Sequence, residues 1–160
     1  MSEIKEDYCP GYLYFREGPL MKLALKNMNI VPDIICCDGN GLLHPKFCGE
    51  ATHFGIKENI PTIGIAKNLY KFEGLEESAD KFIYKTQIIG QKVFFNPEST
   101  KANFISSGYM VALKDAIDIV YHMQKFSKVK SKNSYITKGC DHLVREYQRK
   151  FIEKYGGIKA

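Results

Sequence analysis

Residues 32–41 read PDIICCDGNG, an apolar run that ends in an acid and a glycine-rich turn. An apolar run without polar alternation is typical of a strand covered on both faces of a sheet. Asp38 is therefore expected at the carboxyl end of a strand, where open α/β sheets gather their ligands. Residues 62–67 read TIGIAK and predict a second short buried strand, which ends at Lys67.

The segments on either side of these strands alternate between strand and helix patterns. Residues 12–15 are aromatic and strand-like and lead to Glu17, and Pro19 predicts the first turn of a helix that closes near Met28. Further helices are predicted before Ile60, along the stripe of Leu113, Ala116, Ile117 and Val120, and over 141–155. Further strands are predicted at 91–95 and 103–106. Residues 70–90 are charged and are predicted to be irregular. This alternation predicts an α/β fold, with residues 1–160 forming a single domain.

The composition is that of a globular protein with a net positive charge. Of the 160 residues, 44% are hydrophobic and 26% charged, and the net charge is +5. A basic balance permits nucleic-acid binding without proving it. The chain has no run of about 18 apolar residues and its first seven residues lack a signal core, which predicts an intracellular protein, cytoplasmic or nuclear, without a membrane partner.

Two acids stand out because each follows a strand-like segment. Carboxylates of Glu17 and Asp38 at one edge of a sheet would suit a hard divalent cation such as Mg²⁺. The alternative is that Glu17 caps a helix and Asp38 opens a turn. On spacing alone the alternative is the stronger interpretation.

The order of motifs changes that balance. The motifs are Tyr8-Cys9-Pro10-Gly11, Phe15-Arg16-Glu17-Gly18-Pro19, Asp38-Gly39-Asn40-Gly41, His44-Pro45 and Pro61-Thr62-Ile63-Gly64-Ile65-Ala66-Lys67. As a set, the chain resembles the endonuclease V family. The resemblance implies a ribonuclease H-like mixed sheet flanked by helices. It also implies an endonuclease that uses Mg²⁺, with Mn²⁺ as an alternative, and cuts 3′ of inosine or deoxyinosine in single-stranded RNA or DNA.

The resemblance also assigns roles to individual residues. Glu17 and Asp38 match two metal-binding acids, and Asp141 matches a third polar position, although a one-residue shift would place His142 there. His44 and Lys67 match positions close to the scissile phosphate. Without the family, His44 reads as a packed turn histidine and Lys67 as a surface lysine.

The same comparison implies a pocket for an extruded base. Gly11, Leu13, Gly39 and Gly41 match the positions that line the inosine pocket, and Tyr8 and Pro10 belong to a wedge that fills the gap in the base stack. Tyr70 stands where the family usually has leucine.

The chain departs from the family before Tyr8. Family members usually carry several tens of residues there, with a first strand and a catalytic aspartate, whereas seven residues precede Tyr8 here. We therefore expect a fold that is incomplete at its N-terminus, and a non-catalytic inosine-binding module or a fragment is the alternative function. A nucleotide-cofactor protein is a third hypothesis, which the lack of a GxGxxG pattern and of a P-loop disfavours.

Overall fold

The computed structural model describes residues 7, 9–95, 101–126 and 135–155. Its helices are α1 (Leu13–Lys26), α2 (Glu50–Glu58), α3 (Leu113–Phe126) and α4 (Tyr135–Tyr155). Its strands are β1 (Ile35–Cys37), β2 (Thr62–Ala66), β3 (Leu75–Ser78), β4 (Lys81–Tyr84), β5 (Gln87–Val93) and β6 (Asn103–Tyr109). No helix in the described ranges is both long enough and apolar enough to cross a membrane.

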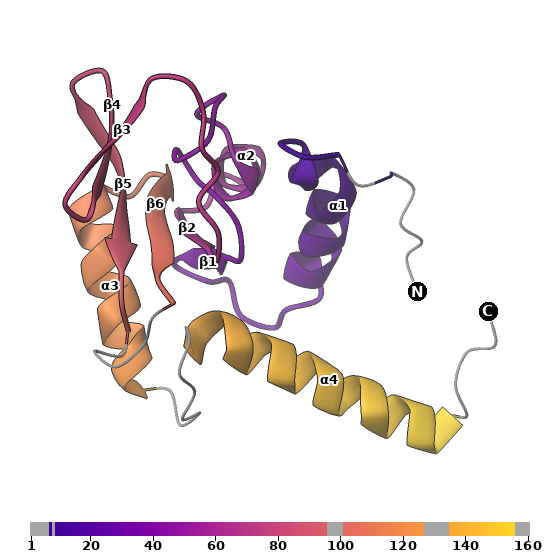
Figure 1. Cartoon of the computed structure of the whole chain (residues 1–160). Coiled ribbons are helices and arrows are strands. Elements are labelled where there is room, and N and C mark those ends of the chain that lie inside the picture. Colours follow the sequence, from indigo (N-terminus) through magenta and orange to yellow (C-terminus); the bar gives the residue numbers. More distant parts are fainter. Residues whose placement is uncertain (1–6, 8, 96–100, 127–134, 156–160) are drawn as a thin grey trace.

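The strands form one mixed sheet in the order β1-β2-β6-β5-β4-β3 (Figure 1). β1 and β2 are parallel, with Ile35 opposite Thr62, and every other pair is antiparallel. A parallel pair brings the carboxyl ends of both strands to one edge. Asp38 and Lys67, which follow β1 and β2, are thereby neighbours.

Helices cover both faces of the sheet. On one face, Ile63 and Ile65 of β2 pack with Ala116 and Val120 of α3 in a fully buried core. On the other face, α2 lies against β2 and β6, and α1 packs on the outer side of α2. Side chains alternate along a strand. Since Ile63 and Ile65 of β2 face α3, Thr62, Gly64 and Ala66 lie on the opposite face, which α2 covers.

The prediction of a strand-like segment at 12–15 is wrong, because these residues begin α1. Aromatic residues are common in strands because their side chains pack well there, and other packing partners can place the same residues in a helix. Tyr14 stacks on His53 of α2, with ring centroids 3.7 Å apart. Pro19 lies inside the helix rather than in its first turn, so Glu17 projects from a helix and does not end a strand.

Two further expectations need correction. Residues 70–90 are not irregular but hold β3, β4 and the start of β5, and the turns between these strands place Ala79 and Lys85 at positive φ. Neither residue belongs to the glycine and asparagine types that normally mark such turns, so the sequence carried no signal. β1 is only partly buried, since it is an edge strand of the described sheet.

Other elements agree with the sequence patterns. The buried strand at 62–66 is β2, and the stripe at 113–120 is α3. The last helix begins at Tyr135 rather than Asp141. The segment 127–134 between α3 and α4 lies outside the described residues.

Candidate active site

The loop after β1 is held rigidly on the sheet. Ser106 accepts a hydrogen bond from the Gly41 N–H at 2.9 Å, and the Asn40 carbonyl accepts one from Ala51 of α2 at 3.0 Å. Gly64 of β2 lets the loop lie directly on the strand, because a Cβ there would be 2.3 Å from the Gly41 nitrogen. The backbone beside Asp38 is therefore preorganised by packing.

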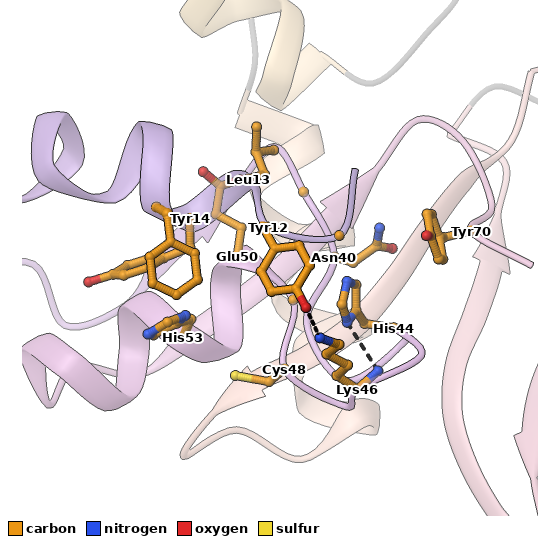
Figure 2. A pocket seen from close by; sticks show the side chains of 14 residues that line it. Tyr12, Leu13, Tyr14, Asn40, His44, Lys46, Cys48, Glu50, His53 and Tyr70 are labelled. Atoms are coloured by element: carbon orange, nitrogen blue, oxygen red, sulfur yellow. Dashed lines mark hydrogen bonds between the residues drawn. The ribbon is translucent and has the colours of Figure 1, made fainter. Parts of the chain in front are cut away.

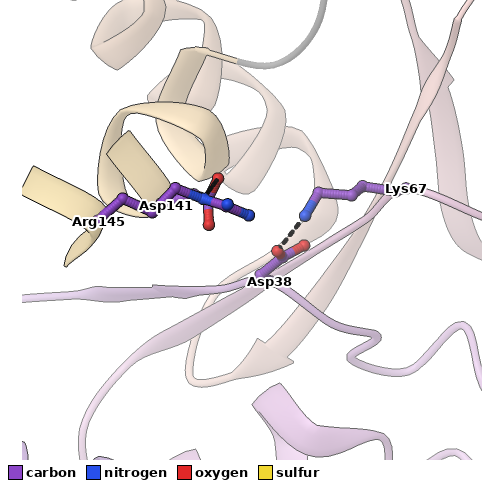
Figure 3. A network of polar contacts seen from close by, with 4 residues as sticks. All are labelled: Asp38, Lys67, Asp141 and Arg145. Carbon is purple, nitrogen blue, oxygen red and sulfur yellow. Dashed lines mark hydrogen bonds and ion pairs between the residues drawn. The ribbon is translucent and has the colours of Figure 1, made fainter. Parts of the chain in front are cut away.

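Asp38 and Lys67 form an ion pair at this edge. The Lys67 ammonium lies 2.5 Å from the Asp38 carboxylate (Figure 3). Both side chains are about half exposed, at 46% for Asp38 and 54% for Lys67, so the pair contributes little to stability. Its value is positional, since it sets a carboxylate and a cation side by side.

Glu50 is a third acid at this site, which the sequence patterns did not single out. It is the first residue of α2, yet it is only 6% exposed. Its pKa is raised to about 8, chiefly by burial and then by the charge of Glu17, a hydrogen bond with Glu17 and the charge of Asp38. Glu17 of α1, Asp38 and Glu50 are therefore electrostatic neighbours, although they come from three separate elements.

This electrostatic strain predicts a pH-dependent stability. The pKa of Glu50 in the folded chain lies above its ordinary value, so its stabilising contribution is complete below about pH 4.5 and is lost as the pH rises through about 8. In EDTA we expect the free energy of unfolding to fall by up to about 1.4 kcal/mol per pH unit across this window. Urea titrations at several pH values would measure how the free energy of unfolding depends on pH. We expect Glu50→Gln to flatten this dependence and the exposed control Glu76→Gln to retain it. An unchanged pH dependence in Glu50→Gln would show that Glu50 is not its cause.

His44 is a buried histidine with a defined tautomer. Its Nδ1 accepts the backbone N–H of Lys46 at 3.2 Å, and burial together with the Lys46 charge lowers its pKa. The neutral ring therefore carries its proton on Nε2. Nε2 faces Gly11, at 3.6 Å from where a Cβ on that glycine would stand. His44 thus offers a hydrogen-bond donor to the space beside Gly11.

That space is a pocket of about 290 Å³ between α1, α2 and the loop after β1 (Figure 2). Gly11, Leu13 and Gly39 line it, as the resemblance implied, together with Asn40, His44, Glu50 and Tyr70. Tyr70 stacks loosely on His44, with centroids 5.7 Å apart. Figure 2 also shows the Tyr12 hydroxyl meeting the Lys46 ammonium at the pocket wall.

A second hollow adjoins the first. It contains Asp38, Lys67 and Asn68, and it shares Leu13, Gly39, Asn40 and Tyr70 with the first pocket. The shared residues form the wall between the two. A planar group in the first pocket would thus have the Asp38–Lys67 pair next to it.

Several other expected site residues, Glu17 among them, line neither hollow. Gly41 is buried beneath β6 and does not line the first pocket. Asp141 lies on α4, where it forms an ion pair with Arg145 at 2.9 Å (Figure 3). Pro10 is exposed beside Gly11, and Tyr8 lies outside the described residues.

Glu17, Asp38 and Glu50 offer the kind of oxygen ligands that divalent cations bind. Within the described ranges, no three Asp, Glu, His or Cys side chains stand close enough together to hold a metal ion. The donors are nevertheless carboxylate oxygens, which hard cations prefer, and Glu50 Oε1 is buried without a hydrogen-bond partner. Asp38 and Glu17 are exposed, and their partners in this structure are Lys67 and Glu50 respectively. The residues therefore fit such a cation in the chemistry of their ligand atoms.

The fold defines the class of protein. A mixed six-stranded sheet with helices on both faces is the ribonuclease H-like arrangement found in solved endonuclease V structures. The family model for endonuclease V matches residues 1–131, and the chain belongs to the endonuclease V family.

Similar proteins place this chain within the family. It is 37% identical to endonuclease V of Dictyoglomus turgidum over 125 residues, which cover 75% of this chain and 54% of the relative. It is 42% identical to endonuclease V of a Nostoc species over 118 residues, covering 71% and 53%. The chain therefore spans about half the length of these curated relatives.

Solved structures agree with the fold. Endonuclease V of Bacillus subtilis superposes with a TM-score of 0.76 at 28% identity, covering 93% of this chain and 66% of that one. Endonuclease V of Ciona intestinalis superposes with a TM-score of 0.76 at 27% identity, covering 94% and 70%, and it was solved in complex with a 24mer DNA that contains an inosine followed by a ribo-adenosine.

Proposed function

We propose that this chain is a metal-dependent endonuclease that cleaves a phosphodiester 3′ of inosine or deoxyinosine, in nucleic-acid repair or RNA processing. The observation that carries the proposal is the pairing of two hollows, one lined by glycines and His44 and the other by Asp38 and Lys67. Membership of the endonuclease V family and the inosine-containing complex of the Ciona relative support it. The 160 residues would act as a single domain.

The first pocket would receive the extruded base. Its volume of about 290 Å³ is at the lower end of small-molecule pockets, which suits a single flat ring system. Gly11 and Gly39 let backbone groups approach the base edge. The Nε2–H of His44 would donate a hydrogen bond to an acceptor oxygen, either on the base or on the flanking phosphate.

The second hollow would receive the phosphate. Lys67 would neutralise a phosphate oxygen, leaving the Asp38 carboxylate for the cation. Glu17 and Asp38 would hold the metal, Mg²⁺ or Mn²⁺, with Asp141 as a further ligand. When bound, such a cation polarises the phosphodiester and activates water. Tyr8 and Pro10 would fill the gap in the stack.

Cleavage of labelled single strands tests this function. With Mg²⁺, we expect the 160-residue chain to cut a strand with a single inosine at least about 100-fold faster than a matched strand with adenosine at that position. The reason is that a base with the wrong hydrogen-bonding edge leaves polar groups of the pocket unpaired. The same pair of strands made as RNA and as DNA reports the natural substrate, since the 2′-hydroxyl distinguishes them. Equal cutting of the inosine and adenosine strands would contradict the proposal.

A second candidate is an inosine-binding module that does not cut. It is favoured by the Asp38–Lys67 ion pair, which occupies the Asp38 carboxylate with a cation of the chain itself. This candidate predicts selective binding of the inosine strand, weakened by salt, without cleavage in Mg²⁺ or Mn²⁺. Equal affinity for inosine and adenosine strands would eliminate it.

A further inference from the structure

Glu50 occupies a position that a helix alone does not explain. The first turn of a helix favours a carboxylate because of the backbone dipole, but an exposed side chain would satisfy that preference. The Glu50 side chain is instead 6% exposed and lines the first pocket. Figure 2 shows its carboxylate directed toward Leu13 at the start of α1.

One oxygen of this carboxylate lacks a partner. Glu50 Oε1 is buried and accepts no hydrogen bond, and the side-chain oxygen of Asn40 in the same pocket is also buried and unpaired. A buried polar atom without a partner costs about 1–3 kcal/mol. Two unpaired acceptor oxygens, both on residues that line one pocket, point to a ligand that is positively charged or rich in donors.

The other oxygen of Glu50 lies against the backbone next to Asp38. A Cβ on Gly39 would be 2.5 Å from Glu50 Oε2, so the carboxylate reaches this place only because residue 39 is glycine. From there it acts electrostatically on both Asp38 and Glu17. Glu50 therefore interacts with both of the exposed acids that the proposed function assigns to the metal.

We propose that Glu50 is a further carboxylate ligand of the divalent cation that Glu17 and Asp38 hold. This inference deepens the proposed function and rests on it. The buried Glu50 oxygen supplies the fixed end of the site, while the exposed Asp38 and Glu17 side chains close on the cation. Metal binding then satisfies an oxygen that the fold leaves unpaired.

Metal binding without nucleic acid tests the assignment. Calorimetry and thermal shift with Mn²⁺ and with Mg²⁺ would be applied to the wild-type chain and to Glu50→Gln, a neutral side chain of the same shape. We expect Glu50→Gln to bind Mn²⁺ at least about tenfold more weakly, since even an indirect partner of a ligand has effects of this size. The matched control Glu76→Gln, an exposed acid on β3, should retain the wild-type affinity.

A second variant acts on the same contact without removing the acid. Gly39→Ala would push aside the flexible end of the Glu50 side chain, and we expect it to weaken Mn²⁺ binding in the same direction by a smaller factor. Wild-type affinity in both variants, or no Mn²⁺ binding by the wild-type chain, would overturn the assignment. If Mn²⁺ binds through Glu50 but the inosine strand is not cut, the proposed function fails and the ligand assignment stands.

Discussion

Asp38→Asn is expected to slow cleavage beside inosine by at least about a thousandfold, which corresponds to about 4 kcal/mol of transition-state stabilisation. The change removes a carboxylate charge from the hollow where the proposed function places the metal and the phosphate. It should leave the free energy of unfolding within about 1 kcal/mol of wild type, because the ion pair with Lys67 is at the surface. Single-turnover rates and thermal unfolding of the same preparations measure the two effects.

The chain offers a matched control for this variant. Asp118 forms an exposed ion pair with Lys114 at 2.9 Å on α3, and neither residue lines either hollow. Asp118→Asn removes the same chemical group from the same kind of pair, and we expect an unchanged rate. Equal cleavage by Asp38→Asn and wild type in Mg²⁺ would remove Asp38 from the catalytic site.

Gly64→Val is expected to have the largest effect on stability, with a loss of at least about 3 kcal/mol. The new Cβ would be 2.3 Å from the Gly41 nitrogen and 2.8 Å from the Gly39 carbonyl oxygen. Both are backbone atoms of a loop pinned by Ser106 and Ala51, so neither can yield cheaply. A melting temperature lower by roughly 10 °C is the expected readout for a chain of this size.

A second glycine supplies the control for this experiment. Gly139 lies within α4, and a Cβ there would meet no atom within 4 Å. Gly139→Ala should stabilise the chain by up to about 1 kcal/mol, because alanine favours a helix and restricts the unfolded chain. A melting temperature for Gly64→Val equal to that of wild type would show that the loop after β1 is not packed against β2 as described.

The sequence by itself determined the strands at the heart of the fold. The apolar runs before Asp38 and Lys67 have no polar alternation, which favours buried strands. They form β1, which is partly buried, and β2, which is buried throughout. The stripe from Leu113 to Val120 likewise became α3, because a period of 3.6 residues places those side chains on one face. The ordered motifs identified the family, which the family model confirms.

The sequence could not determine local structure where propensity and packing disagree. Tyr12–Phe15 has the aromatic composition of a strand, but Leu13–Phe15 lie in α1, where Tyr14 stacks on His53. The hairpins at 75–93 turn through Ala79 and Lys85, which carry no turn signature. In both cases the decisive contacts come from residues distant in sequence or from backbone geometry.

Only the tertiary structure decided the membership of the candidate site. Glu50 reads in the sequence as an ordinary acid at a helix start, and nothing in its neighbours marks it. Its burial beside Gly39, and its electrostatic contact with Glu17 and Asp38, arise because α1, α2 and the loop after β1 converge. The parallel pairing of β1 and β2 likewise brings Lys67 to Asp38 across 28 intervening residues, since a parallel pair places both carboxyl ends at one edge of the sheet.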